Sequence, residues 1–214
     1  MYTPESFART ELSELHSFVE KHAFATLISA GSDVSDEPLA THLPLLLDRA
    51  ASGQGMLTGH FARANPHWKS AANRSVLAIF HGAHAYISPS WYEATNVVPT
   101  WNYITVHAHG RLRLIDDRGQ LKEAVRRLVA AYESPRSDPW TLDRAEPQFI
   151  DRLLDGIVGF TIDVQRWEGK WKLSQNHDVQ RQDRVIAALL NEPSSGARQI
   201  ALEMQANRKQ QGAS

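Results

Sequence analysis

The histidines and large aromatic residues of this 214-residue chain gather in one stretch, from His81 to Arg113. This stretch holds four of the ten histidines and two of the six tryptophans. Aromatic rings stack on flat ligands, and imidazoles donate or accept hydrogen bonds near neutral pH. The stretch is therefore the first candidate for a surface that binds a planar molecule.

Paired histidines within the same stretch raise the question of a metal. His107 and His109 are two residues apart, so on a strand they project from one face, and such pairs do ligate metals. His42, His60 and His67 are further candidates. No carboxylate accompanies His107 and His109 in the sequence. We therefore predict no metal site and expect these imidazoles to form hydrogen bonds across a barrel wall.

A second chemical signal lies at the junction 58–66, with the sequence TGHFARANP. A strand runs there into an expected helix over 62–72, with Arg63 and Pro66 in its first turn. Free backbone N–H groups and a guanidinium at a helix start favour an anion. The competing interpretation is a solvated arginine. A third segment, 167–175, alternates Lys170 and Lys172 with aromatic rings; the alternative there is an exposed barrel strand.

Several well-known catalytic motifs are missing from the chain. It contains no G-x-G-x-x-G, Walker A, G-x-S-x-G or H-E-x-x-H pattern. It also has no cysteine, which excludes disulfides and thiolate chemistry. An anion site and a ring-rich face without an acid–base pair favour a bound aromatic phosphate.

The bulk composition is that of an ordinary globular protein, with 42% hydrophobic and 22% charged residues. The net charge of -1 provides no basic field for nucleic acid. The N-terminus lacks a signal-peptide pattern, and no apolar run approaches the ~20 residues that span a bilayer. We expect a soluble, cytoplasmic protein with no membrane partner.

Alternating hydrophobic patterns predict mostly antiparallel strands with helices between and after them. Pro44 lacks a backbone donor and predicts a sheet edge or a bulge. The pattern favours an α+β, mainly β fold: a small closed barrel with peripheral and C-terminal helices. One domain is expected over 1–190, followed by a helical, partly flexible tail over 191–214. The expected strands are 24–29, 38–48, 56–61, one opening at 75–80, 102–115 and 157–164, and the other expected helices are 12–22, 119–133, 149–154, 179–190 and 197–208.

Long blocks of the chain resemble a known family. They are ATHLPLLL at 40–47, GH at 59–60 with ANPHW at 64–68, HAYISPSWY at 84–92, VPTWNY at 98–103 and GKWKLSQN at 169–176. In this order they resemble the PaiB-like, FMN-binding negative transcriptional regulators, from residue 1 to about residue 190. The resemblance implies a split β-barrel of the flavin-reductase and pyridoxamine-phosphate-oxidase type, a homodimer that holds FMN at the subunit interface.

The resemblance also implies which residues contact FMN. One strand would follow the isoalloxazine edge, through Thr41, His42, Leu43 and Pro44. The ribityl phosphate would lie near Gly59, His60, Arg63 and Asn65. The second subunit would bring Trp101, Asn102 and Tyr103, and the last strand would close the pocket with Lys172, Ser174 and Gln175. The catalytic residue, if there is one, is unknown; His42 and Tyr103 are candidate proton donors.

Three functions are open at this point. The first is a flavin-dependent sensor or regulator, and the second is an FMN-dependent oxidoreductase acting on a small substrate. The third is a haem-binding split barrel with His107 or His109 as the axial ligand, since the chain lacks the basic pattern of the oxidase relatives. The family resemblance implies DNA as a partner, but the near-neutral charge and the lack of a clear helix-turn-helix do not support it.

Overall fold

The structure is a computed structural model of the chain, and it describes all residues except 32–36, 52 and 212–214. The chain forms two compact units. Unit 1 comprises residues 1–15, 81–106 and 168–214, and unit 2 comprises residues 16–80 and 107–167. The units therefore interleave along the chain. The division into a domain over 1–190 and a tail over 191–214 stays a prediction.

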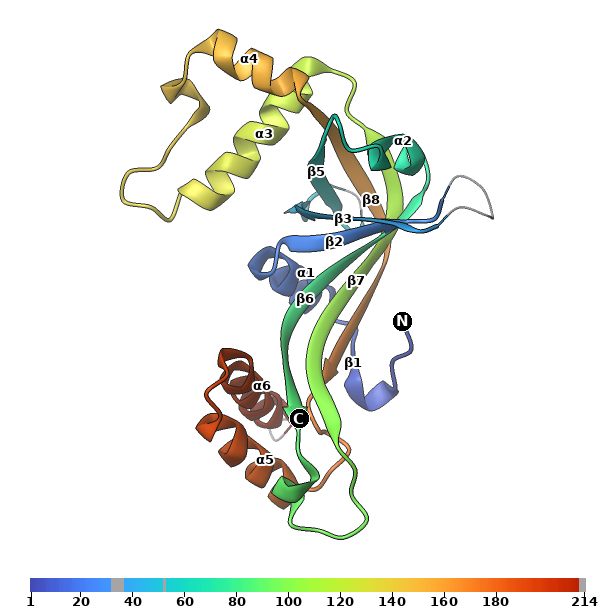
Figure 1. Ribbon diagram of the computed structural model, residues 1–214, viewed down its shortest axis with the longest axis vertical. Coiled ribbons are helices and arrows are strands. Elements are labelled where there is room, and N and C mark those ends of the chain that lie inside the picture. Colours follow the sequence, from blue (N-terminus) through green and yellow to red (C-terminus); the bar gives the residue numbers. More distant parts are fainter. Residues whose placement is uncertain (32–36, 52, 212–214) are drawn as a thin grey trace. The chain divides into compact units, whose positions relative to one another are not determined.

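Eight strands are hydrogen-bonded in the order β3-β2-β6-β7-β8-β5-β4, with β1 paired to β8 (Figure 1). The strands are β1 Ala8–Arg9, β2 Phe24–Ser29, β3 Leu39–Pro44, β4 Leu46–Asp48, β5 Met56–Ala62, β6 Ser75–Ile87, β7 Thr100–Leu114 and β8 Ile157–Lys172. The α-helices are α1 Leu12–Lys21, α2 His67–Ala71, α3 Arg118–Glu133, α4 Pro147–Asp155, α5 Val179–Asn191 and α6 Ser195–Gln211, and the short 3-10 helices are η1 Glu5–Phe7, η2 Pro89–Tyr92 and η3 Leu142–Arg144. This arrangement confirms the predicted α+β fold with an antiparallel sheet and C-terminal helices.

The sheet of unit 2 curls around an aromatic core. β2 pairs antiparallel with β3 and β6, and β5 pairs antiparallel with β4 and β8. β3, at one end of the strand order, also contacts β5 near the other end. Phe61, Phe80 and Phe160 are fully buried, with the Phe61 and Phe160 ring centroids 4.7 Å apart. Burial of these large rings is the main stabilising contribution to such a core.

The predicted strand 38–48 is two strands. β3 ends at Pro44 and β4 begins at Leu46. β3 is the terminal strand of the order, so Pro44 lies on a sheet edge, where its missing N–H leaves no ladder bond unmade. Most of the predicted polar connection before β3, residues 32–36, lies outside the described part of the chain.

The helix predicted over 62–72 is too long. α2 contains five residues and begins at His67, with Pro66 at its N-cap. Arg63 lies four residues before the helix, in a turn, because Asn65 donates its backbone N–H to the carbonyl of Ala62. The expected anion site, with Arg63 in the first turn of a helix beside its free N–H groups, is therefore wrong in its geometry.

Two helices of unit 2 pack against each other through their apolar faces. α3 begins after Asp117, whose side chain accepts the backbone N–H of Gln120 and so caps the helix. The buried residues between α3 and α4 form a cluster, which consists of Leu121, Leu142, Ile150 and Leu154. This confirms helices at both predicted places.

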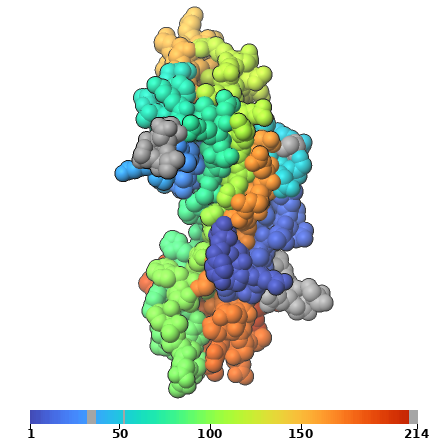
Figure 2. All heavy atoms as spheres, turned by 90° about the vertical axis from the view of Figure 1, so that its right-hand side faces the viewer, coloured from blue at the N-terminus to red at the C-terminus, as the bar shows by residue number. Residues whose placement is uncertain are grey.

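Unit 1 contains the ends of the long strands together with α5 and α6, which pack side by side (Figure 1). Ala8 pairs with Lys170 and Arg9 with Gly169, and Figure 2 shows the N-terminal segment against the last part of the sheet. α6 buries Ile200, Ala201 and Met204. The helical part of the predicted tail is thus packed, and the last three residues, 212–214, lie outside the described part of the chain.

Membrane insertion finds no support in the helices. Among the residues that the structure describes, no helix is both long enough and apolar enough to cross a bilayer.

Candidate functional site

A hydrogen-bonded network of polar side chains lies at the edge strand β3 of unit 2. Thr41 Oγ1 is 2.8 Å from His67 Nδ1, and Ser29 Oγ is 2.9 Å from His67 Nε2. The Asn65 side-chain amide donates to Thr41 Oγ1 at 3.0 Å, and Asn65 Oδ1 accepts the backbone N–H of His67 at 3.0 Å. β3, the turn before α2 and β2 therefore fix one hydroxyl at the sheet edge.

The His67 ring at the centre of this network is neutral near physiological pH. It is 2% exposed and packs 5.3 Å from the Phe61 ring. Burial lowers the pKa of His67, because desolvation disfavours the charged form. A neutral imidazole donates at one nitrogen and accepts at the other, and hydroxyls can serve both. The network is therefore satisfied without a buried charge.

The other edge residues predicted to contact FMN differ in exposure. His42 is exposed, whereas Leu43 is 4% exposed and belongs to the core. Gly59 packs inward: a Cβ there would lie 2.8 Å from Leu45 and 3.2 Å from the carbonyl of Pro44. Leu43 and Gly59 therefore shape the wall behind the edge, and a ligand at the edge meets Thr41 and His42.

His60, on β5, is one of the residues predicted to lie near the flavin phosphate. It is half-buried and opposes Gly159 in the register with β8. Burial lowers the pKa of His60. The side chain is therefore a neutral hydrogen-bonding group at neutral pH and gives little charge attraction for a phosphate.

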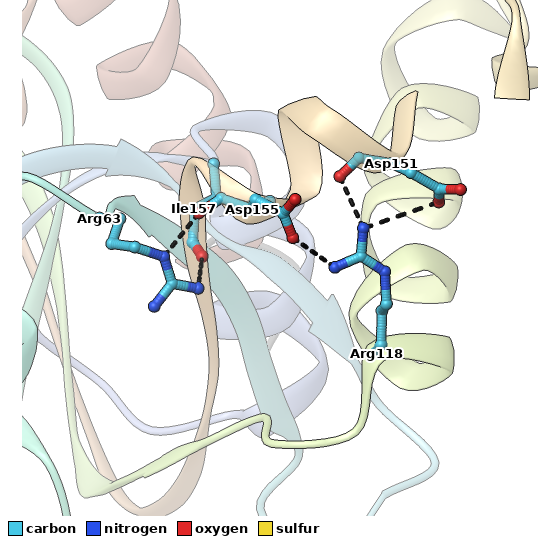
Figure 3. A network of polar contacts seen from close by, with 5 residues as sticks. All are labelled: Arg63, Arg118, Asp151, Asp155 and Ile157. Atoms are coloured by element: carbon cyan, nitrogen blue, oxygen red, sulfur yellow. Dashed lines mark hydrogen bonds and ion pairs between the residues drawn. The ribbon is translucent and has the colours of Figure 1, made fainter. Parts of the chain in front are cut away.

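Arg63 contacts the end of α4 (Figure 3). Its Nε donates to the carbonyl of Asp155 at 2.6 Å and its Nη2 to the carbonyl of Ile157 at 2.8 Å. Arg118 reaches the same region, donating 2.5 Å to the Asp155 carboxylate and 2.6 Å to the carbonyl of Asp151. Cations suit the carbonyl end of a helix, so both arginines stabilise α4. Contact between Arg63 and a flavin phosphate stays a prediction.

The six remaining predicted residues lie in unit 1. Trp101 is 52% exposed, with its ring 5.8 Å from Tyr86 and 6.0 Å from His84. Tyr103 is half-buried, and Lys170 Nζ lies 5.2 Å from its ring. Asn102 is fully buried and donates to Ser174 Oγ at 3.0 Å. Only Trp101 of these three presents a large exposed ring.

The three residues predicted to close the pocket are held by neighbouring groups. Lys172 donates to Thr100 Oγ1 and, at 2.7 Å, to the carbonyl of Trp101. The side-chain amide of Gln175 bridges the backbone of its own loop. It accepts a hydrogen bond from the backbone N–H of Leu173 and donates one to the carbonyl of Trp171. Gln175 thereby shapes the loop that carries Ser174.

A cavity of about 310 Å³ lies within unit 1. Three segments build it: the N-terminal segment, the connection from η2 into β7, and the residues from the end of β8 into α5. Figure 2 shows these segments meeting on one face, coloured dark blue, green and orange. The lining residues are Phe7, Tyr92, Asn96, Val97, Val98, Thr100, Asn102, Lys172, Ser174, Asn176, His177 and Arg181.

The residues predicted from the sequence cover only part of these two sites. At the edge they include Thr41 and Asn65 but not Ser29, and they include His67 only as a candidate metal ligand. In unit 1 they include Asn102, Lys172 and Ser174 but not, among others, Tyr92, His177 and Arg181. The block HAYISPSWY contained one signal, since Tyr92 ends it.

The antiparallel split-barrel sheet and its polar edge define a class of flavin-binding folds. Within this class the chain belongs to the family described as "Putative FMN-binding domain", which matches residues 1–166. A curated relative is the "Protease synthase and sporulation protein PAI 2" of Bacillus subtilis. It is 38% identical over 212 residues, which cover 99% of this chain and 100% of the relative. The family predicted from the sequence blocks is confirmed.

Solved structures share the fold at low sequence identity. The flavocytochrome Anf3 from Azotobacter vinelandii has a TM-score of 0.59 and 14% identity, over 77% of this chain and 69% of that one. The FAD and heme binding protein from Mycobacterium smegmatis has a TM-score of 0.52 and 15% identity, over 85% and 79%. These likenesses establish the fold alone.

Proposed function

We propose that the chain binds FMN at the interface of a homodimer and serves as a flavin-dependent sensor or regulator. The family membership supports flavin binding. The edge of β3 is the proposed place for the flavin, because Asn65 and His67 fix the Thr41 hydroxyl there. A hydroxyl held from two sides is oriented in advance for a ligand, which lowers the entropy lost on binding.

The residues of this edge have the hydrogen-bonding groups that a flavin ring requires. Its ring edge carries hydrogen-bond donors and acceptors, which Thr41, His42 and the backbone of β3 can complement. The phosphate has less support, because Arg63 already donates to two carbonyls and burial keeps His60 neutral. We therefore expect the ring system to contribute more to affinity than the phosphate.

The second half of the proposed site is Trp101 of the other subunit. Its ring is 52% exposed, and a large exposed aromatic side chain is typical of a surface that meets a ligand or a partner. FMN, when bound, supplies one- or two-electron transfer. The protein's part is to orient the ring at Thr41 and to exclude water at Trp101.

The test is a comparison of FMN with riboflavin, which lacks the phosphate. Purified protein should show a flavin absorbance band or take up FMN saturably, and Arg63→Met should bring FMN affinity closer to that of riboflavin. Arg118→Met is the matched control, since it removes the neighbouring contact to α4 without a predicted flavin role. A protein that is monomeric and takes up neither flavin would contradict the proposal.

Haem is a second candidate ligand. Two structural neighbours are a flavocytochrome and an FAD and heme binding protein. His107 and His109 offer half-buried imidazoles on β7, with ring centroids 6.3 Å apart. A Soret band after haem addition that is lost in His107→Ala or His109→Ala would favour this ligand over FMN.

A further inference from the structure

We propose that the cavity of unit 1 binds a small organic carboxylate, through Tyr92, His177 and Arg181. This site is distinct from the edge of β3, but its lining includes Asn102, Lys172 and Ser174, which the family resemblance assigns to the flavin pocket. The proposal rests on Tyr92, His177 and Arg181, which are not among those flavin contacts. The cavity has a cationic side, a buried tyrosine hydroxyl and an apolar wall.

The cationic side consists of Lys172 and Arg181, with the His177 imidazole beside them, and no Asp or Glu is among the residues that line the cavity. Two carboxylates are adjacent in sequence to lining residues. Asp178, next to His177, caps α5 and lies 3.4 Å from Arg181 Nε, and it is largely exposed. Glu93, next to Tyr92, pairs with Arg184 at 3.1 Å. The acids around the cavity are therefore engaged at its rim, and the lining itself carries positive charge.

The basic residues of the lining are close enough to affect one another's pKa values. Burial lowers the pKa of His177, and Arg181 and Lys172 lower it further, while Asp178 acts in the opposite direction. Burial and the neighbouring Lys170 also lower the pKa of Lys172. Like charges held together in this way are relieved by a bound anion.

The Tyr92 hydroxyl supplies the second observation. Tyr92 is 1% exposed, and its Oη makes no hydrogen bond of normal geometry among the described residues, although the Ser174 side chain lies close enough to affect its pKa. A buried hydroxyl without a well-formed hydrogen bond is destabilising, so a ligand oxygen that reached Oη would stabilise the site. Burial raises the pKa of Tyr92, while Ser174 and Arg181 act in the opposite direction.

The apolar wall sets the size and kind of ligand. Phe7, Val97 and Val98 line the cavity together with the polar groups. A volume of about 310 Å³ is at the small end of ligand sites. A carboxylate on a short apolar body matches both sides, whereas an inorganic anion leaves the apolar wall uncovered.

The backbone of the cavity is also specialised. Asn96 and Ser174 have φ of 59° and 64°, in the left-handed region that side chains other than glycine and asparagine rarely adopt. Ser174 is nevertheless held in place by its hydrogen bonds with Asn102. Such local strain is common where a site is prearranged.

Benzoate and its neutral analogue benzamide are the probes, measured by isothermal titration calorimetry on the full chain at low salt. Benzoate should bind saturably, and benzamide should bind at least about tenfold more weakly because it lacks the charge that Arg181 meets. Arg181→Met should lower benzoate affinity about tenfold, and Tyr92→Phe several-fold. Arg198→Met, an exposed arginine of α6 outside the lining, is the matched control and should bind benzoate as the unaltered protein does.

The proposal is overturned if benzoate fails to bind, if benzamide binds equally well, or if Arg181→Met and Tyr92→Phe bind benzoate unchanged. Tyr92→Phe removes only an oxygen that makes no well-formed hydrogen bond, so the variant should fold, and a circular dichroism spectrum checks this. Neither residue belongs to the proposed flavin contacts. Loss of benzoate binding with FMN binding retained therefore separates this site from the flavin proposal.

Discussion

Unit 2 and unit 1 assemble their candidate binding groups in different ways. In unit 2 the polar groups sit on the edge of a curled sheet, and Ser29, Thr41, Asn65 and His67 satisfy one another. In unit 1 the groups line a cavity made by loops and helix ends, and the Tyr92 hydroxyl makes no hydrogen bond of normal geometry among the described residues. The polar groups of the first site hold one another in place, whereas those of the second site do so less completely.

This difference indicates how each site should respond to change. A closed network on a rigid sheet ties the site to fold stability, so substitutions there should cost stability as well as affinity. Removal of the Tyr92 hydroxyl, which makes no well-formed hydrogen bond, should lower ligand affinity at little cost to stability.

The largest effect is expected for Gly110→Ala on β7 in unit 2. A Cβ at Gly110 would clash with the backbone carbonyl of Asp163 and lie 2.6 Å from the Ile162 side chain. Two backbones of one sheet must move apart, so we expect a loss of about 3 kcal/mol in the free energy of unfolding, measured by urea denaturation. Gly53→Ala, with nothing within 4 Å of the added Cβ, is the control. Equal stability of the two variants would refute the rigid packing described for unit 2.

Asn102→Ala tests the contribution of a hydrogen-bonded residue in the lining of the unit 1 cavity. Asn102 is fully buried and exchanges hydrogen bonds with Ser174. Its removal leaves a buried hydroxyl less satisfied and a small void, so we expect a loss of about 2 kcal/mol in urea denaturation. Tyr92→Phe, which removes a hydroxyl without a well-formed hydrogen bond, should cost far less. Equal destabilisation of the two variants would contradict the weak hydrogen bonding described for the Tyr92 hydroxyl.

Thr41→Val should have a smaller effect. The substitution keeps the shape but removes the hydroxyl that meets Asn65 and His67, so we expect a loss of about 1 kcal/mol, since the group is only half-buried. Thr41→Ser restores the hydroxyl and should recover most of the stability. Thermal unfolding of both variants without flavin measures this, and a fully stable Thr41→Val would show that the network is dispensable.

The pH dependence should show the smallest effect. The folded pKa of His67 is lowered by burial, so the unfolded chain binds a proton more readily. The free energy of unfolding therefore falls as pH drops below the unfolded value of about 6.5 and levels off below the folded pKa. Half-buried His22, His60 and His177 act in the same direction. His67→Gln should make the loss between about pH 7 and pH 5 shallower, whereas His42→Gln, at an exposed position, should not.

Much of the fold could be predicted because period-two and helical patterns are local. The alternation along β7 places Ile104, Val106 and Ala108 inside, as expected for one face of a strand. Helix starts were less predictable. The 62–72 pattern continues through Arg63, but the turn at 62–65 and Pro66 delay α2 to His67.

The sites could be predicted only where one block of sequence carried them. Thr41 and His42 lie in one block, so both were found. The partner Ser29 comes from β2 and the ring of His67 from α2, and their meeting depends on how the sheet curls. The cavity of unit 1 combines three segments that are distant in sequence. No local pattern in the sequence indicates that Tyr92 and Arg181 line the same cavity.

The most direct test of the flavin site is an equilibrium titration of FMN into the purified protein and its Thr41→Val variant, followed by quenching of flavin fluorescence. The proposed site predicts saturable, equimolar binding to the unaltered chain and about tenfold weaker binding to the variant. Absence of saturable binding, or equal affinity of the two proteins, would contradict a flavin site at the edge of β3.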